Sequence, residues 1–264
     1  MRAVFASFLI VVAGCSGGGG RSDATAANEV GAEAGLEVGL EVGATPFRVL
    51  LFSRTTGFRH DSIPTAIAAL TDLGATGGYA AEATEDPAAF TAENLARFRV
   101  VVFLMTTGDP LDAAGQAAFE AWIGGGGNYV GVHSAADTEY DWPFYGQLVG
   151  AYFKTHPCCL LQAALDVEVA DNPATAGLPS PWTRTDEWYD FQTNPRAIAT
   201  VLVTIDESSY VGGTMGPDHP MVWAHATTGG GRAIYTAMGH TKESYAEPLF
   251  RQHLVGAIRW AAGF

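Results

Sequence analysis

The pattern of apolar and polar residues changes at Phe47, and from there apolar runs alternate with amphipathic segments. Short apolar runs indicate buried strands, whereas apolar residues at every third or fourth position indicate a helix. The alternation predicts an α/β domain with a mainly parallel sheet flanked by helices. The early strands are predicted at FRVLLFS (47–53), GYAAEATED (78–86), RVVVFLMTTG (99–108) and NYVGVH (128–133).

Four segments read as helices. In the first of them, Ser62 is the predicted N-cap, Pro64 falls in the first turn and Gly74 is the predicted end. In the second, the predicted apolar face consists of Ala114, Ala117, Ala118, Ala121 and Trp122. The four segments are SIPTAIAALTDLG (62–74), LDAAGQAAFEAWIGGGG (111–127), WPFYGQLVGAYF (142–153) and EPLFRQHLVGAIRWAAGF (247–264).

Four further strands follow late in the chain with few helices between them. This order predicts that antiparallel strands extend the parallel core. The segments are ALDVEVAD (164–171), ATVLVTID (199–206), MVWAHA (221–226) and RAIYTAMGH (232–240).

Composition limits the possible partners of the chain. Its 264 residues are 48% hydrophobic, enough to bury the core of one globular domain. Lys and Arg total 14 against 28 Asp and Glu, which gives a formal charge of −14, and the basic residues form no run. Such a surface repels phosphate backbones and anionic headgroups, so we expect no nucleic acid partner.

The first 15 residues have the pattern of an export signal. One arginine precedes an apolar run from Ala3 to Val12, which is too short to span a bilayer stably. The end of the run, VAGC, resembles a bacterial lipobox, in which Cys15 would be lipidated; an ordinary soluble signal is the alternative. We therefore expect an exported protein, bound to the cell envelope only through its N-terminal lipid.

Residues 16–45 separate this signal from the domain at 46–264. They are rich in Gly, Ala and Glu, lack aromatic residues and contain the tandem GLEVGLEV. Such a segment buries too little apolar area to offset the entropy of ordering, and we expect a disordered tether. Cys158 and Cys159 are adjacent, which disfavours a disulfide between them, and we expect apolar packing groups.

Candidate chemistry lies at the strand ends. In an open parallel sheet, ligands bind beyond the carboxyl ends of the strands. His60 follows the first strand, His133 ends the fourth and His240 ends the last, so all three are expected at one edge. Neutral imidazoles there could move protons or bind a metal ion. The other histidines, at 156, 219, 225 and 253, are expected to serve structure or face solvent.

Several segments together resemble the trehalose-utilisation (ThuA-like) family, in order and over Phe47–Phe264. The resemblance implies the class I glutamine amidotransferase-like superfamily and a flavodoxin-like sheet. The segments are LLFSRTTGFRHDSIPTAIAAL, GVHSAADTEYDWPFYGQLVGAYFKTHP, TDEWYDF, DHPMVWAHATTGGGRAIYTAMGHTKESY and FRQHLVGAIRWAAG.

The chain departs from that superfamily at its nucleophile. The resemblance implies Gly-x-Cys-x-Gly at a strand-to-helix turn, but GVHSA places His133 at the cysteine position. GHTKE places His240 at the position of the superfamily's base. An imidazole cannot form the glutamyl thioester that ammonia release requires, and Cys158 and Cys159 lack the glycine-flanked turn. We therefore expect no glutaminase activity.

A carboxylate is expected to join the histidines. In TRTDEWYDF, Asp186 and Glu187 are neighbours whose side chains point to opposite faces of an extended chain, and we favour Glu187. His60, His133, His240 and Glu187 would suit Zn²⁺ or a similar divalent ion with an open position. The alternative is metal-free acid–base chemistry by His133 and His240, with His60 and Glu187 beside them.

Aromatic and polar residues near the strand ends suit a carbohydrate, because sugars stack on rings and hydrogen-bond to charged groups. The expected substrate-binding residues are Arg59, Asp137, Tyr140, Asp186, Trp188 and Glu243.

The leading interpretation is a cell-envelope enzyme of hydrolase, lyase or isomerase type. The resemblance implies a trehalose-related or 3-keto sugar as its substrate. A sugar-binding protein without turnover and a purely structural module are the alternatives; the structural module predicts that side chains fill the strand-end rim.

Overall fold

The structure is a computed structural model that describes residues 46–264. The predicted signal, Cys15 and the tether lie outside the described residues. Among the residues described, no helix is both long and apolar enough to cross a membrane.

Five parallel strands form the core of a nine-stranded sheet, in the order β2-β1-β3-β4-β11. Helices cover both faces, so the central strands are apolar along their whole length. The strands are β1 (Phe47–Phe52), β2 (Tyr79–Thr84), β3 (Val100–Leu104), β4 (Asn128–Val132) and β11 (Arg232–Thr236).

Antiparallel strands extend this core beyond β11, in the order β10-β9-β6-β7. Three of the four predicted late strands lie here, and the fourth, β11, pairs in parallel with β4 inside the core. Two short strands form a separate sheet. The strands are β10 (Pro220–Ala226), β9 (Thr200–Ile205), β6 (Leu161–Val167), β7 (Trp182–Asp186), β5 (Phe153–Thr155) and β8 (Asp190–Phe191).

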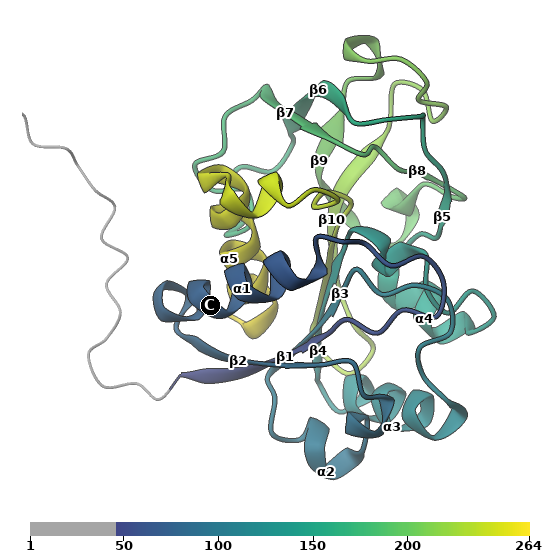
Figure 1. The fold of residues 1–264 in the computed structure, drawn as a ribbon, viewed down its shortest axis with the longest axis vertical. Helices are drawn as coiled ribbons and strands as arrows, with labels where there is room; N and C mark the ends of the chain where they lie inside the picture. Colours follow the sequence, from purple (N-terminus) through teal and green to yellow (C-terminus); the bar gives the residue numbers. More distant parts are fainter. Residues whose placement is uncertain (1–45) are drawn as a thin grey trace, which may run out of the picture. The chain divides into compact units, whose positions relative to one another are not determined.

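Helices α1 and α5 cover one face of the parallel core, and α3 and α4 lie on the other (Figure 1). The predicted mainly parallel α/β fold with an antiparallel extension is therefore confirmed. The helices are α1 (Ile63–Gly77), α2 (Ala92–Leu95), α3 (Ala113–Gly124), α4 (Pro143–Val149) and α5 (Pro248–Ala262). Short 3-10 helices are η1 (Pro87–Ala89), η2 (His133–Ala136), η3 (Pro195–Ala197), η4 (Glu207–Ser209) and η5 (Glu243–Ala246).

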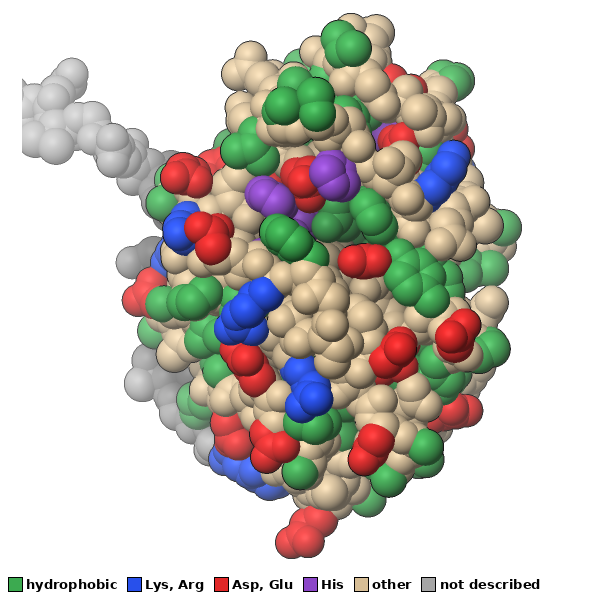
Figure 2. Space-filling model, turned by 45° about the vertical axis from the view of Figure 1, so that its right-hand side comes forward, with side chains coloured by type: hydrophobic (Ala, Val, Ile, Leu, Met, Phe, Trp, Pro, Cys, Tyr) green, Lys and Arg blue, Asp and Glu red, His purple; other side chains and the backbone are tan. Residues whose placement is uncertain are grey.

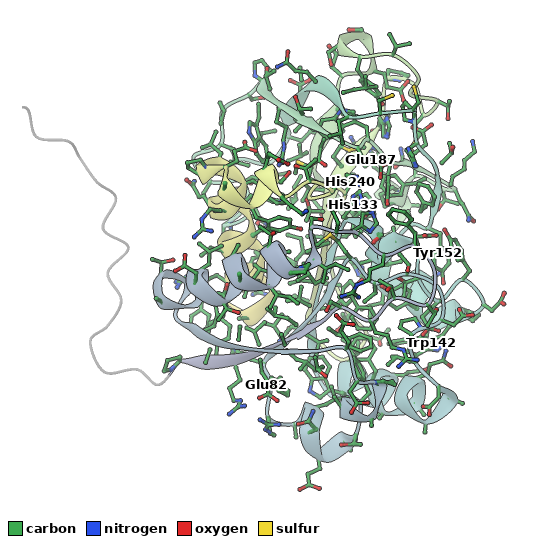
Figure 3. The ribbon with its side chains drawn as sticks, in the orientation of Figure 1. Glu82, His133, Trp142, Tyr152, Glu187 and His240 are labelled. Atoms are coloured by element: carbon green, nitrogen blue, oxygen red, sulfur yellow. The ribbon has the colours of Figure 1, made fainter. Side chains whose placement is uncertain are left out.

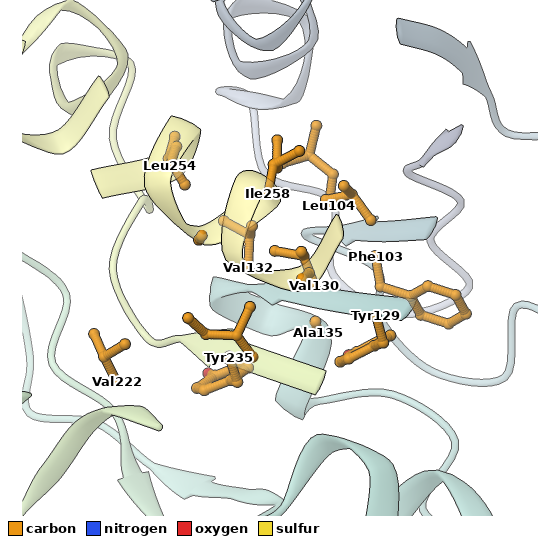
Figure 4. Packing of buried hydrophobic residues seen from close by; sticks show 14 of the residues in the cluster. Phe103, Leu104, Tyr129, Val130, Val132, Ala135, Val222, Tyr235, Leu254 and Ile258 are labelled. Carbon is orange, nitrogen blue, oxygen red and sulfur yellow. The ribbon is translucent and has the colours of Figure 1, made fainter. Parts of the chain in front are cut away.

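Side chains from both faces of β3 and β4 build the core (Figure 4). Leu104 and Val132 point toward α5, where Leu254 and Ile258 meet them, while the Phe103 and Tyr129 rings lie on the opposite face. All of these side chains are almost completely buried.

The ends of α1 differ from the prediction. Ser62 makes no side-chain cap, because its hydroxyl instead donates to the carbonyl of His240 at 2.6 Å. The helix also continues past Gly74 and ends before Gly78, whose φ of 73° is left-handed. Gly74 is needed inside the helix, since a Cβ there would lie 2.5 Å from the carbonyl oxygen of Tyr79.

The predicted apolar face of α3 is only partly right, because of its five residues only Ala118 and Trp122 pack against the core. The helix buries Gly115, Phe119 and Ile123, which recur every four residues, whereas Ala114, Ala117 and Ala121 are exposed. Phe119 and Ile123 bury far more apolar area than alanines, so they decide which face packs.

The prediction that Cys158 and Cys159 are packing groups is also wrong. Both are free and exposed, in the loop between β5 and β6. Cys159 has a φ of 76°, a conformation of tight turns, and the turn carries both side chains away from the core.

Candidate active site

Three histidines and one glutamate converge at the carboxyl edge of the sheet. His60 follows β1, His133 follows β4, His240 follows β11 and Glu187 follows β7. Four antiparallel steps separate β11 from β7, so β7 runs in the same direction as the parallel strands and ends at the same edge. One ligand atom from each side chain lies within 4.8 Å of the others. We call these four residues the histidine–glutamate cluster.

Backbone geometry fixes the orientation of His133. The residue has a left-handed φ of 51° at the turn from β4 into η2, and its side chain is fully buried. Its Nδ1 lies 2.8 Å from the carbonyl oxygen of Ala237. Because only an N–H can donate to a carbonyl, neutral His133 carries its proton on Nδ1 and turns the lone pair of Nε2 into the cluster.

Glu187, His240 and His133 lie next to one another (Figure 3), and one atom from each forms a small triangle. His133 Nε2 lies 3.1 Å from His240 Nδ1 and 3.4 Å from Glu187 Oε2. Glu187 Oε2 lies 3.0 Å from His240 Nδ1. Either a proton on His240 Nδ1 or a cation must lie between these atoms, because three lone pairs this close would repel one another.

His60 packs against the other two histidines of the cluster. Its Nδ1 lies 3.3 Å from the hydroxyl of Ser134. Its ring packs edge-on against the rings of His133 and His240, with ring centroids 4.8 and 4.9 Å apart. Burial, and then the charges of His133 and His240, lower the pKa of His60 to about 3. His60 is therefore a neutral ring near pH 7.

Glu187 and His240 stabilise each other's charged forms. Burial alone would raise the pKa of Glu187, but the neighbouring imidazoles of His133 and His240 lower it well below its usual value. Burial alone would lower the pKa of His240, but the hydrogen bond and charge of Glu187 raise it. Glu187 is thus an ionised acceptor, and His240 holds a proton more tightly than a free histidine.

The position of His240 depends on Asp186. The buried carboxylate of Asp186 accepts hydrogen bonds from the backbone N–H of Gly239 at 2.9 Å and of His240 at 3.1 Å. Arg184 lies 3.1 Å from the same carboxylate. The expectation that Asp186 binds sugar is therefore wrong, because the side chain is fully buried and already paired.

Two residues to which sequence reasoning gave no role in the site support the cluster. The ring of Tyr189 stacks on His133 with centroids 4.3 Å apart. His156, predicted to be structural, places its Nδ1 3.4 Å from Glu187 Oε1, and 38% of its side chain is exposed. Their only sequence signals were the motifs TDEWYDF and KTHP, which gave no spacing to the strand-end histidines.

The donor set fits a divalent ion. Two imidazole nitrogens and one carboxylate oxygen lie 3.0–3.4 Å apart, close to the ligand separation of about 3.3 Å around tetrahedral zinc. The hydrogen bond from His133 Nδ1 to a carbonyl is the support that metal-bound histidines usually receive. His60 lies within reach as a fourth ligand.

Exposure divides the cluster into buried and accessible members. His133 is fully buried, whereas 27% of the His240 side chain and 12% of the Glu187 side chain are exposed. Figure 2 shows histidine side chains grouped around a carboxylate on this face. Within the cluster, only His240 and Glu187 are accessible to a sugar, and the neighbouring His156 is exposed beside them.

The other predicted sugar-binding residues fall into two groups. Tyr140 and Asp137 lie together, with the Tyr140 hydroxyl 2.7 Å from Asp137 Oδ1. Burial raises the pKa of Asp137, and Tyr140 is 38% exposed. By contrast, Arg59 is exposed and paired with Glu85 at 2.6 Å, and Glu243 is exposed on η5.

The expected platform at Trp188 is wrong. Its side chain is 1% exposed and its Nε1 donates to the carbonyl of Leu161 at 2.8 Å, so the ring belongs to the core. Phe58 is the exposed ring instead. It is 66% exposed and packs edge-on against His60, with ring centroids 4.9 Å apart.

A sequence model of the ThuA family, described as trehalose utilisation, matches residues 48–261. A ThuA-like protein from Bacteroides uniformis is similar, with 24% identity, a TM-score of 0.72, and 85% of this chain and 94% of that chain covered. A ThuA-like protein from Parabacteroides merdae has 18% identity and a TM-score of 0.65, and the match covers 83% of this chain and 90% of that chain. A cytoplasmic protein from Salmonella typhimurium has 10% identity and a TM-score of 0.55, and the match covers 81% of this chain and 98% of that chain. These likenesses show a shared fold, and no curated protein matches the sequence.

Proposed function

The chain belongs to the ThuA, or trehalose utilisation, family, and on that premise we propose that it is an enzyme acting on a sugar or glycoside. A trehalose-related or 3-keto sugar is the proposed substrate. The observation that carries the proposal is the triangle of His133, Glu187 and His240, whose atoms lie 3.0–3.4 Å apart at the exposed edge.

The accessible members carry the proton transfer in this proposal. His240 holds its proton firmly because Glu187 raises its pKa, so it acts as the acid toward a sugar oxygen. Glu187, ionised and 12% exposed, is the base, and its low pKa would rise as His240 gives up its proton to the sugar. His133 is buried and cannot reach a sugar, so its proposed part is to orient His240 or to bind a metal ion.

A carbonyl beside the reacting carbon would suit this pair. In a 3-keto sugar, the C–H bonds next to the ketone are acidic, so Glu187 can remove a proton while His240 donates one to the ketone oxygen. The product of that step is an enediol, which can isomerise or eliminate a neighbouring substituent. Within this proposal, proton transfer beside a ketone favours the lyase and isomerase types.

Metal binding is the second form of the same proposal. His133, His240, Glu187 and His60 would hold the ion, and it would polarise a sugar oxygen. Their nitrogen and oxygen donors suit Zn²⁺. Phe58 and the Tyr140–Asp137 pair would contact the sugar, through ring stacking and hydrogen bonds.

Incubation with disaccharides tests the proposal. Residues 46–264 are mixed with native and 3-oxidised disaccharides, with and without chelator, and products are followed by NMR. We expect turnover of a 3-oxidised sugar, loss of turnover in His240→Gln, and retention in His225→Gln, a histidine outside the cluster. Loss of turnover in the presence of chelator would support the form of the proposal in which a metal ion is bound.

A sugar-binding protein without turnover is the second candidate, favoured by the complete burial of His133. It predicts saturable sugar binding with no product from any member of the panel. That outcome would reject the enzyme and retain the binding protein.

We also propose export and lipid anchoring. The proposal is supported by the sequence of residues 1–15, where an apolar run leads to Cys15. The anchor would place the domain at the cell envelope.

A further inference from the structure

A second group of possible metal ligands lies outside the histidine–glutamate cluster. Asp190 on β8, Glu207 on η4 and His219 just before β10 each offer an atom within 4.8 Å of the others. Asp190 and His219 are fully buried, and 17% of the Glu207 side chain is exposed. We call these residues the Asp190 cluster.

Both ring nitrogens of His219 face acceptors. Nδ1 lies 2.8 Å from Glu207 Oε1, which also accepts from the backbone N–H of Met215. Nε2 lies 2.8 Å from the carbonyl oxygen of Tyr189 and 3.7 Å from Asp190 Oδ1. The Tyr210 hydroxyl approaches Nδ1 at 3.3 Å.

Asp190 has an oxygen without a partner. Its Oδ2 accepts from the hydroxyl of Thr214, but Oδ1 has no hydrogen bond although the side chain is fully buried. A buried carboxylate oxygen without a donor is unfavourable unless a cation offsets its charge. The orphan oxygen faces Nε2 of His219.

We propose that the Asp190 cluster binds a divalent cation through Asp190 Oδ1, His219 Nε2 and the Tyr189 carbonyl oxygen. Nε2 lies at hydrogen-bond distance from the Tyr189 carbonyl, and the ion would replace that hydrogen bond. With the proton of His219 on Nδ1, the three atoms would all present lone pairs, and an ion between them would satisfy the orphan oxygen. Glu207 then accepts from Nδ1–H, as carboxylates do behind metal-bound histidines. The mixed nitrogen and oxygen donors suit Zn²⁺ or Mn²⁺.

The proposed ion has a consequence for the histidine–glutamate cluster. The same residue, Tyr189, offers its carbonyl to the ion and stacks its ring on His133 at 4.3 Å. The ion would fix the backbone of Tyr189 and so hold His133 in place. Its role is structural, and it does not depend on any sugar chemistry.

Metal content of the full chain tests the site. The chelated protein is dialysed against Zn²⁺ or Mn²⁺, and bound metal is measured by mass spectrometry. The double variant Glu187→Gln/His240→Gln removes the first cluster, and we expect it to retain one ion per chain. Adding Asp190→Asn, which preserves the shape of the side chain, should remove that ion.

If the variant that carries Asp190→Asn fails to fold, a second measurement still tests the proposed site. Crystals of the Glu187→Gln/His240→Gln protein soaked in Mn²⁺ or Zn²⁺ should give an anomalous peak beside Asp190. No ion in that protein, or an ion located elsewhere, would overturn the proposal.

Discussion

At the scale of single residues, the charge of Glu187 controls the cluster. Glu187→Gln keeps the shape of the side chain but removes the charge that raises the pKa of His240. We expect sugar turnover to fall at least about 100-fold, because both the base and the support of the acid are lost. The NMR titration of His240 should move to lower pH. Glu85→Gln, at a surface pair with Arg59, is the control, and equal turnover in both variants would exclude the assigned base.

His253 links a single residue to acid stability. It is fully buried on α5, with Nδ1 2.7 Å from the carbonyl oxygen of Ala174 and Nε2 without a partner. Burial lowers its pKa from 6.5 to about 4. Between these pH values the unfolded chain binds a proton that the folded chain does not. The free energy of unfolding should therefore fall by up to about 3 kcal/mol as the pH drops through this window.

Urea unfolding between pH 7 and pH 4.5 measures this effect. His253→Asn can still donate to Ala174 through its amide but cannot titrate, so its stability should depend less on pH than that of the wild type. Carboxylates and the other histidines titrate in both proteins and cancel in the difference. Parallel curves for the two proteins would show that His253 contributes nothing.

At the scale of elements, the sequence predicts what hydrophobic periodicity can encode. The buried strands β1, β3 and β4 and helix α5 fall where the apolar pattern placed them. Strand β7 was missed because Arg184 and Asp186 point inward from it, and their mutual pairing makes a buried face look polar. Strands β5 and β8 have three and two residues, too few to show any period.

Close backbone packing fixes α5 against its neighbours. A Cβ at Gly256 would lie 1.9 Å from the carbonyl oxygen of Pro173, so Gly256→Ala must push the helix outward. We expect a loss of about 2 kcal/mol in the free energy of unfolding. Gly124 at the end of α3 is the matched control, because a Cβ there meets nothing within 4 Å. Gly124→Ala should be neutral or slightly stabilising, and equal losses would refute the packing argument.

At the scale of the whole molecule, the candidate site depends on segments far apart in the sequence. Strand direction alone predicts that His60, His133 and His240 share one edge. Sequence reasoning assigned no role in a site to His156 and did not find the Asp190 cluster, since loops that cross between strands bring these residues into place. Sequence reasoning also chose Trp188 as a ring on which a sugar stacks, because composition does not distinguish a buried ring from an exposed one.

The whole chain divides, by our proposal, into an anchor and a catalytic domain that function separately. In cells fed labelled palmitate, wild-type protein should incorporate label and sediment with membranes, whereas Cys15→Ser should do neither, because the thiol is the site of lipidation. The two proteins should unfold at the same temperature and turn over sugar equally, since the family match begins at residue 48. Cys158→Ser/Cys159→Ser is the control and should stay labelled. Membrane-bound, labelled Cys15→Ser protein would contradict the anchor.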